Sequence, residues 1–159
     1  MTVIASIMLA AATAVAGGTA KITAGSAYYD RKEGFAYFSG KVFVEDATYS
    51  IHADRAYVFM SGTNDLKRLV AIGNVAMTNE NKRAYGAKAS YYRAPGMVVL
   101  TAPDGGYAEV REEKPEGPQI VRGRKIKFWT ETKQVEVIDA NITAPTKNVM
   151  GGMKNTLGR

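Results

Sequence analysis

The chain has 159 residues, of which 46% are hydrophobic, and its 21 Lys and Arg against 15 Asp and Glu give a formal net charge of +6. This length suits a single domain with its own core, and the apolar content excludes a disordered chain. With no cysteine and one histidine, the sequence excludes thiolate chemistry and zinc sites built on Cys or several His, while the basic excess favours an anionic partner.

The first twenty residues carry no charge. Ala14-Val15-Ala16 before Gly17 has the small-x-small form of a signal-peptidase site. We therefore predict a signal peptide over residues 1–16, cleaved after Ala16, and hence export. The competing interpretation is a membrane anchor, because residues 1–20 just reach the roughly 20 apolar residues that a span needs. The Ala-, Thr- and Gly-rich composition of the run favours the signal peptide.

From Thr19 onward apolar and polar residues alternate in short runs rich in Tyr, Val, Phe and Ile, the types that fit a pleated, half-buried surface. Turn signals such as Asp30–Gly34, Ser61–Asp65 and Ala94–Gly96 separate these runs, and no proline interrupts an apolar run. This pattern predicts an all-β sandwich or jelly roll over residues 17–145. The Gly-, Asn- and Lys-rich residues 146–159 are predicted to be a flexible tail.

A quasi-repeat organises these runs. A phrase with a small first residue and a following aromatic run starts at Ala24, Ala53, Gly86 and Gly123, and the starts lie 29, 33 and 37 residues apart. A second strand-like phrase with a short pivot follows each one: Gly40-Lys41, Gly73-Asn74, Ala102-Pro103-Asp104 and Asp139-Ala140-Asn141. The repeating unit is therefore a pair of strands, used four times.

The two terminal strands are expected to lie at open sheet edges. The stretch 20–24 has no gatekeeping proline, and neither has 135–142 before Pro145. Such edges are able to accept a strand from another chain.

Period-two alternation predicts which side chains share the inner face. The side chains predicted to line the inner face are Phe38, Val42, Val44, Tyr49, Ile51, Leu69, Val75, Met77, Leu100, Ile126 and Phe128. The simpler alternative is that each of these residues belongs to the core of a sandwich. One bulge would invert the facing of a strand. Of the adjacent Tyr91 and Tyr92, one should point inward and one outward.

No enzyme site is predicted. The sequence contains no Gly-rich phosphate loop, no His-Glu-x-x-His and no G-x-S-x-G string, and His52 with Asp54 is interpreted as a surface pair. We therefore expect no catalytic residue, no metal and no cofactor. A different class, nucleic-acid binding, is suggested by basic and aromatic residues interleaved over Arg122–Trp129. Export argues against it, because an exported protein meets no ordinary nucleic-acid target.

Five stretches of the sequence are similar to segments of a known protein family: Phe38–Val44, Tyr49–Phe59, Ala71–Val75, Val98–Thr101 and Ile120–Ile126. In order and spacing they resemble the LptA/OstA-like family of lipopolysaccharide transport proteins over about residues 22–144. The third pivot, Ala102-Pro103-Asp104, departs from the Gly-Asn-Val form of that family.

This resemblance implies a periplasmic β-jelly roll, open at both ends, whose apolar inside carries the acyl chains of lipopolysaccharide. It implies edge-to-edge stacking with copies of itself, and a bridge from an LptC-like inner-membrane jelly roll to an LptD-like outer-membrane protein. It also implies that the side chains predicted to line the inner face bind lipid, and it adds Ile22 to this lipid-binding set. An LptC-like protein that keeps its N-terminus as an anchor is the alternative within the family.

The densest basic cluster allows a phosphate-binding rim. Its members are Arg122, Arg124 and Lys125, followed by Lys127. Arg side chains there would bind lipid phosphates in bidentate fashion. The alternative, which the pattern favours, is an outward, solvated face of a strand.

Overall fold

The structure is a computed structural model that describes residues 21–45, 49–61, 65–129, 131–132 and 134–145. Within these residues it is all-β, as predicted, and every strand pairing is antiparallel. The predicted signal peptide (1–16) and tail (146–159) lie outside the described residues. In the described part of the chain, no helix is long and apolar enough to cross a membrane.

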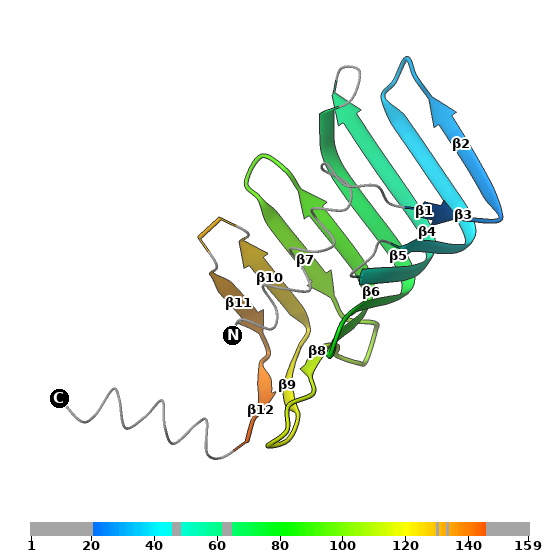
Figure 1. The fold of residues 1–159 in the computed structure, drawn as a ribbon. Helices are drawn as coiled ribbons and strands as arrows, with labels where there is room; N and C mark the ends of the chain where they lie inside the picture. The colour runs from blue at the N-terminus through cyan, green and yellow to red at the C-terminus, as the bar shows by residue number, and fades with distance from the viewer. Residues whose placement is uncertain (1–20, 46–48, 62–64, 130, 133, 146–159) are drawn as a thin grey trace.

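In the described residues, twelve strands form one sheet (Figure 1). They are β1 (Lys21–Thr23), β2 (Ser26–Asp30), β3 (Phe35–Glu45), β4 (Tyr49–Ser61), β5 (Asp65–Asn79), β6 (Lys82–Tyr92), β7 (Met97–Thr101), β8 (Ala108–Glu112), β9 (Gln119–Gly123), β10 (Lys125–Trp129), β11 (Val135–Ile138) and β12 (Asn141–Thr143).

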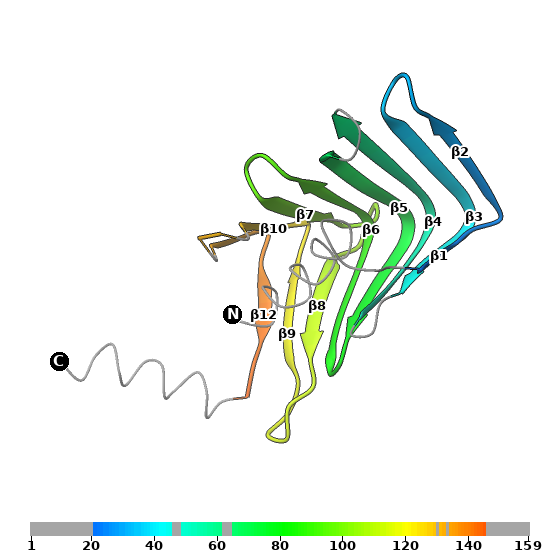
Figure 2. The same cartoon turned by 45° about the horizontal axis from the view of Figure 1, so that its top comes forward.

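The sheet is folded into a V with two arms (Figure 2). Strands β3 to β6 run through both arms and bend midway. Half of β3 pairs with β2 and its other half with β1, and β6 likewise pairs first with β8 and then with β7. We call the arm that contains β2, β7, β10 and β11 the first arm, and the arm that contains β1, β8, β9 and β12 the second arm.

The bends of the long strands coincide with β-bulges. The β3–β4 register shifts between Ser39 and Val42, and the β5–β6 register shifts between Ile72 and Val75. In both bulges the backbone has positive φ, at Gly40-Lys41 and at Gly73-Asn74. A bulge of this kind bends and twists its strand, so the predicted pivots form the corner of the V.

Contacts between neighbouring strands stabilise the corner. Asp54 lies where the β4–β5 register shifts between His52 and Arg55, and it accepts a hydrogen bond of 3.0 Å from the Asn74 side-chain amide. Farther along, a Cβ on Gly86 would lie 2.7 Å from Leu100 Cδ1. Gly86, which opens the third repeat phrase, is therefore needed where β6 and β7 approach closely at the corner.

In the rest of the sheet, a short strand of one arm ends at the corner and a short strand of the other arm begins there. The Gly25 N–H donates to the Gly40 carbonyl (2.8 Å), Ala102 donates to Arg124 (2.9 Å), and Arg124 donates to Ile138 (2.8 Å). The four predicted strand pairs are thus bent hairpins laid side by side. The third pivot is opened into the turn between β7 and β8, where the sequence departs from the family pattern.

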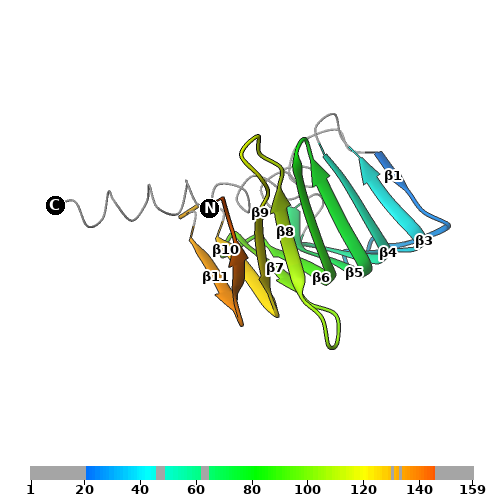
Figure 3. The same cartoon turned by 90° about the horizontal axis from the view of Figure 1, so that it is seen from below.

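The terminal strands lie at the two edges of the sheet, as predicted. Among the described residues, β1 and β2 pair only with β3, while β11 pairs only with β10 and β12 only with β9. Viewed from below, the strands of the second arm follow one another from β1 across to β9 (Figure 3). One side of each edge strand therefore has no strand partner in this part of the chain.

Candidate functional site

The space between the arms is lined by three rows of side chains that run across the sheet. Each row follows the cross-strand register, so its members point to one face. In the first arm the rows are Ala27, Phe38, Ala56, Ala71, Ala89, Leu100, Ile126, Val137 and Tyr29, Ala36, Val58, Leu69, Tyr91, Val98, Phe128, Val135. In the second arm the row is Ile22, Val44, Ile51, Met77, Ala84, Val110, Val121, Ile142. We call the surface that they form the trough.

No residue of these three rows is charged. The adjacent rows on the outer faces differ sharply: Lys127 pairs with Glu136 (3.3 Å) and Arg122 with Glu109 (2.7 Å). At the tip of the second arm the next inward row becomes polar, with Lys82, Glu112 and Gln119 among its members. The trough is therefore an apolar strip with a polar border.

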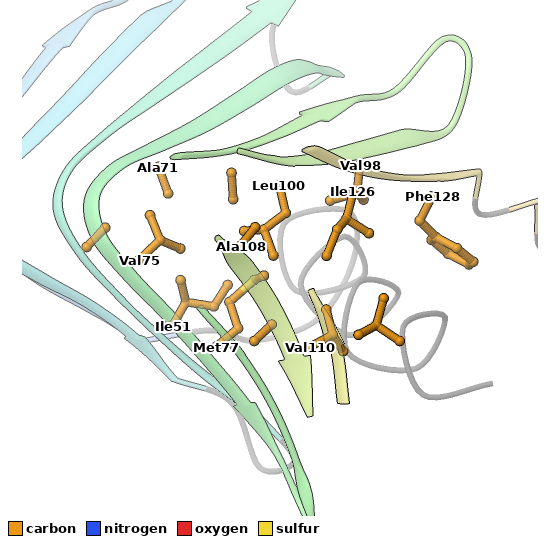
Figure 4. Packing of buried hydrophobic residues seen from close by; sticks show 14 residues of the cluster. Ile51, Ala71, Val75, Met77, Val98, Leu100, Ala108, Val110, Ile126 and Phe128 are labelled. Atoms are coloured by element: carbon orange, nitrogen blue, oxygen red, sulfur yellow. The ribbon is translucent and has the colours of Figure 1, made fainter. Parts of the chain in front are cut away.

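The side chains in the middle of the trough are buried. Phe128, Leu100 and Ile126 have no exposed surface, and Val110 and Met77 have 1% and 3%. Figure 4 shows these side chains pointing from both arms toward the space between them. One continuous apolar cluster thus joins the two arms.

The ends of the trough are open. Ile22 at the β1 end is 46% exposed and Tyr29 in β2 is 53% exposed, while Ile142 in β12 is 54% exposed. These end residues belong to the same uncharged rows as the middle of the trough, but their side chains are exposed to solvent. The trough thus reaches both sheet edges with bare apolar side chains.

The structure brings the predicted lining residues together. Phe38, Leu69, Leu100, Ile126 and Phe128 lie in the rows of the first arm. Ile22, Val44, Ile51 and Met77 form half of the row in the second arm, and Val42 and Val75 are buried at the corner next to it. Tyr49 pairs with Asn79 through its backbone, and its side chain lies outside what the structure describes.

The ambiguity at the tyrosine pair is resolved by register. Tyr91 pairs between Leu69 and Val98 and packs against the core cluster. Tyr92 points to the outer face, where its ring lies 4.9 Å from the Arg68 guanidinium carbon. Tyr91 is therefore the inward residue of the two.

Several inward residues were not predicted. Ala84, Val110 and Val121 lie in the row of the second arm. The alternation Ala108-Glu109-Val110-Arg111 carried a usable signal for Val110. At Ile120-Val121 two apolar residues are adjacent, so alternation alone does not say which one faces inward.

The predicted phosphate-rim residues lie away from the trough. Arg122 is on the outer face of the second arm, where its Nε donates to Glu109. Arg124 is exposed at the corner and lies 3.9 Å from Asp139, and Lys125 lies one residue from the inward Ile126, on the outer face of the first arm. This placement matches the alternative of a solvated strand face, and the phosphate-rim role stays a prediction.

Other candidate sites are not supported by the contacts. The His52 ring stacks on Phe43, 4.4 Å between centroids, while Asp54 bonds to Asn74. In Arg122–Trp129, the aromatic Phe128 is buried inward, so of the two aromatic residues only Trp129 shares the outer face of β10 with the cations Lys125 and Lys127. Within the residues that the structure describes, no group of three or more His, Asp or Glu is placed to hold a metal ion.

Comparison with known proteins gives a consistent result. Residues 21–148 match the family model described as "LptA/(LptD N-terminal domain) LPS transport protein". A search of curated protein sequences gave no match. Among solved structures, the chain is similar to LptH from Pseudomonas aeruginosa, the LptA homologous periplasmic component of a lipopolysaccharide transport device. The match has a TM-score of 0.63 and 18% identity and covers 80% of this chain and 95% of that one, which supports the fold.

Proposed function

Because the chain belongs to the LptA/LptD N-terminal domain family of lipopolysaccharide transport proteins, we propose that its trough shelters the acyl chains of lipopolysaccharide. The observation that carries the proposal is the absence of charge from three cross-strand rows that span the sheet from edge to edge. Removing a methylene from water is worth about 0.8 kcal/mol, so partial cover of several acyl chains gives firm holding. Holding of this kind requires no catalytic group.

The open edges support a stacked assembly. The end strands β2 and β12 present Tyr29 and Ile142 with more than half of their surface exposed. A neighbouring strand that paired with these edges would continue the trough and cover both residues. We propose that the protein works in the periplasm as part of a bridge, stacked on itself and between an LptC-like and an LptD-like jelly roll. The energy for movement comes from a partner.

Whether the chain keeps an anchor or loses a signal peptide concerns residues 1–20, which lie outside the described structure. We propose cleavage after Ala16, from the small-x-small pattern in the sequence. Mass measurement of the mature protein, with a start near Gly17 expected, tests it against the LptC-like alternative.

A photo-crosslinking experiment tests the trough. A photoreactive phenylalanine analogue is placed at Phe38 and, in a second variant, at its neighbour Tyr37. Both native side chains are aromatic and partly buried, but Phe38 points into the trough and Tyr37 contacts Tyr57 on the outer face. The pair Val44 and Phe43 repeats the design in the second arm.

We expect adducts with labelled lipopolysaccharide at positions 38 and 44, and at least about tenfold weaker labelling at positions 37 and 43, since alternate residues face opposite sides. Circular dichroism of each variant confirms that the sheet is intact. Equal labelling of inner and outer positions in folded protein would reject the trough as the lipid site.

A further inference from the structure

A pocket lies on the outer face of the first arm, near its tip. Phe59, Arg68 and Tyr92 are neighbours in the register of β4, β5 and β6. Together with Lys67 and with Ala94-Pro95 of the β6–β7 turn they line a pocket with a volume of about 320 Å³. This volume is within the range of small-molecule sites.

An irregularity in β5 places a second cation, Lys67, beside Arg68 in the pocket lining. Phe59 pairs with Arg68, but the next pair is Met60 with Leu66, so Lys67 is an extra residue in the strand. An extra residue of this kind changes the alternation of side chains locally. The consequence is that Lys67 and Arg68, although adjacent in sequence, line the same pocket.

Arg68 is held between two aromatic rings. Its guanidinium carbon lies 5.8 Å from the Phe59 centroid and 4.9 Å from the Tyr92 centroid. Its Nε is buried and has no hydrogen-bond acceptor. Ring faces attract the cation but accept no hydrogen bond of full strength from Nε, so burial leaves a donor unsatisfied.

Arg68 differs in this from other cations of the sheet. Arg122 pairs with Glu109, Lys127 with Glu136 and Arg124 with Asp139. The residues that line the pocket include no Asp or Glu to neutralise Lys67 and Arg68. The pocket thus combines two positive charges, a donor without an acceptor and an apolar wall.

We propose that this tip pocket binds a phosphate group, carried by the sugar headgroup of the lipid whose acyl chains occupy the trough. A phosphate monoester carries close to two negative charges, which matches two cations better than one carboxylate does, and the Arg fork binds two of its oxygens. Tyr92 and Pro95 offer an apolar surface to the attached sugar. The identity of the carrier rests on the proposed function, whereas the phosphate chemistry rests on the pocket alone.

The position of the pocket favours a headgroup as the source. Leu69 and Tyr91, next to Arg68 and Tyr92 in sequence, face the trough on the other side of the same two strands. The β6–β7 turn separates the two surfaces at the tip of the arm. A headgroup that leaves the trough between the arms therefore needs to pass only this tip to reach Arg68.

Calorimetric titration of the whole protein tests the proposal. The free probes are inorganic phosphate and glucosamine 1-phosphate, and glucosamine, which lacks the phosphate, is the control. The lipid probes are lipopolysaccharide and the same preparation after phosphatase treatment. Each is titrated into the parent protein, Arg68→Gln, Lys67→Gln and Arg83→Gln, the last being an exposed arginine on the outer face of the second arm.

We expect Arg68→Gln to weaken binding of glucosamine 1-phosphate and of lipopolysaccharide by about tenfold or more, since a charge-assisted pair is lost. Lys67→Gln, an exposed change that leaves the ring stack intact, weakens both by about threefold, and Arg83→Gln leaves both unchanged. Phosphatase treatment removes the difference between Arg68→Gln and the parent.

Equal affinities of Arg68→Gln, Lys67→Gln and the parent for every phosphate probe would overturn the proposal. A loss confined to the free probes, with lipopolysaccharide indifferent to phosphatase, would overturn the lipid as the carrier. Crosslinking at Phe38 separates the two hypotheses. Adducts there with no phosphate dependence contradict the pocket alone, and their absence contradicts the trough.

Discussion

The middle and the ends of the trough have the same apolar composition but opposite exposure. In the single row of the second arm, Met77, Ala84 and Val110 are at most 3% exposed, whereas Ile22 and Ile142 at its two ends are 46% and 54% exposed. All residues of the row are therefore uncharged, but a side chain of the row is buried only where its strand has a neighbouring strand on both sides. The middle supports the fold, and the ends are apolar surface that a partner would cover.

A buried charge should separate the two regions most strongly. Val110→Asp places a carboxylate in the closed middle and should lower the free energy of unfolding by about 4 kcal/mol or more, because no partner is available there. Ile142→Asp, in the same row, should cost less than about 1 kcal/mol. Urea unfolding followed by the fluorescence of Trp129 measures both. Similar losses would mean that the ends are as well packed as the middle.

Truncation of a side chain should give a smaller contrast. Met77→Ala leaves a cavity in the cluster and should cost about 2–4 kcal/mol. Ile22→Ala removes a comparable side chain that water already reaches, so we expect a loss below about 1 kcal/mol. Thermal unfolding of the two variants provides the comparison, and a larger loss at Ile22 would contradict it.

A charge at the ends should change assembly rather than stability. Tyr29→Lys in β2 and Ile142→Lys in β12 should alter the free energy of unfolding by less than about 0.5 kcal/mol, yet suppress end-to-end association, since lysine at an edge opposes strand pairing. Sedimentation velocity reads the size distribution. Tyr85→Lys, exposed on the outer face of the second arm, is the control that should still associate. Unchanged association of the end variants would show that the copies meet elsewhere.

Much of the inner face could be predicted because the alternation of residues survives the bends. Phe38 and Val42 both face inward, although a bulge lies between them, because the bulge at Gly40-Lys41 turns the strand without inverting its second half. The small residues and pivots of the repeat marked the corner for the same reason. A strand can turn sharply only where side chains are small or the backbone tolerates positive φ.

The sequence favoured an outward face for the basic cluster, but it did not show where in the sheet the charged groups lie. Arg122 and Lys125 are close in sequence but lie on either side of the corner, on the outer faces of different arms. Phe59, Arg68 and Tyr92 lie 9 and 24 residues apart in sequence and meet only because three strands are in register. The extra residue at Lys67 is visible only in that register, so local patterning gave no sign of the tip pocket.

The continuous path of the sheet contains eight strands. Neighbouring strands lie about 4.8 Å apart in a sheet, so the trough of one molecule is about 34 Å long. Strands that follow one another in sequence are mostly neighbours in the sheet, and the number of strands sets the length of the trough in one molecule. If copies join end to end, the distance they span grows in steps of this size, and a gap between two membranes is bridged only by a whole number of them.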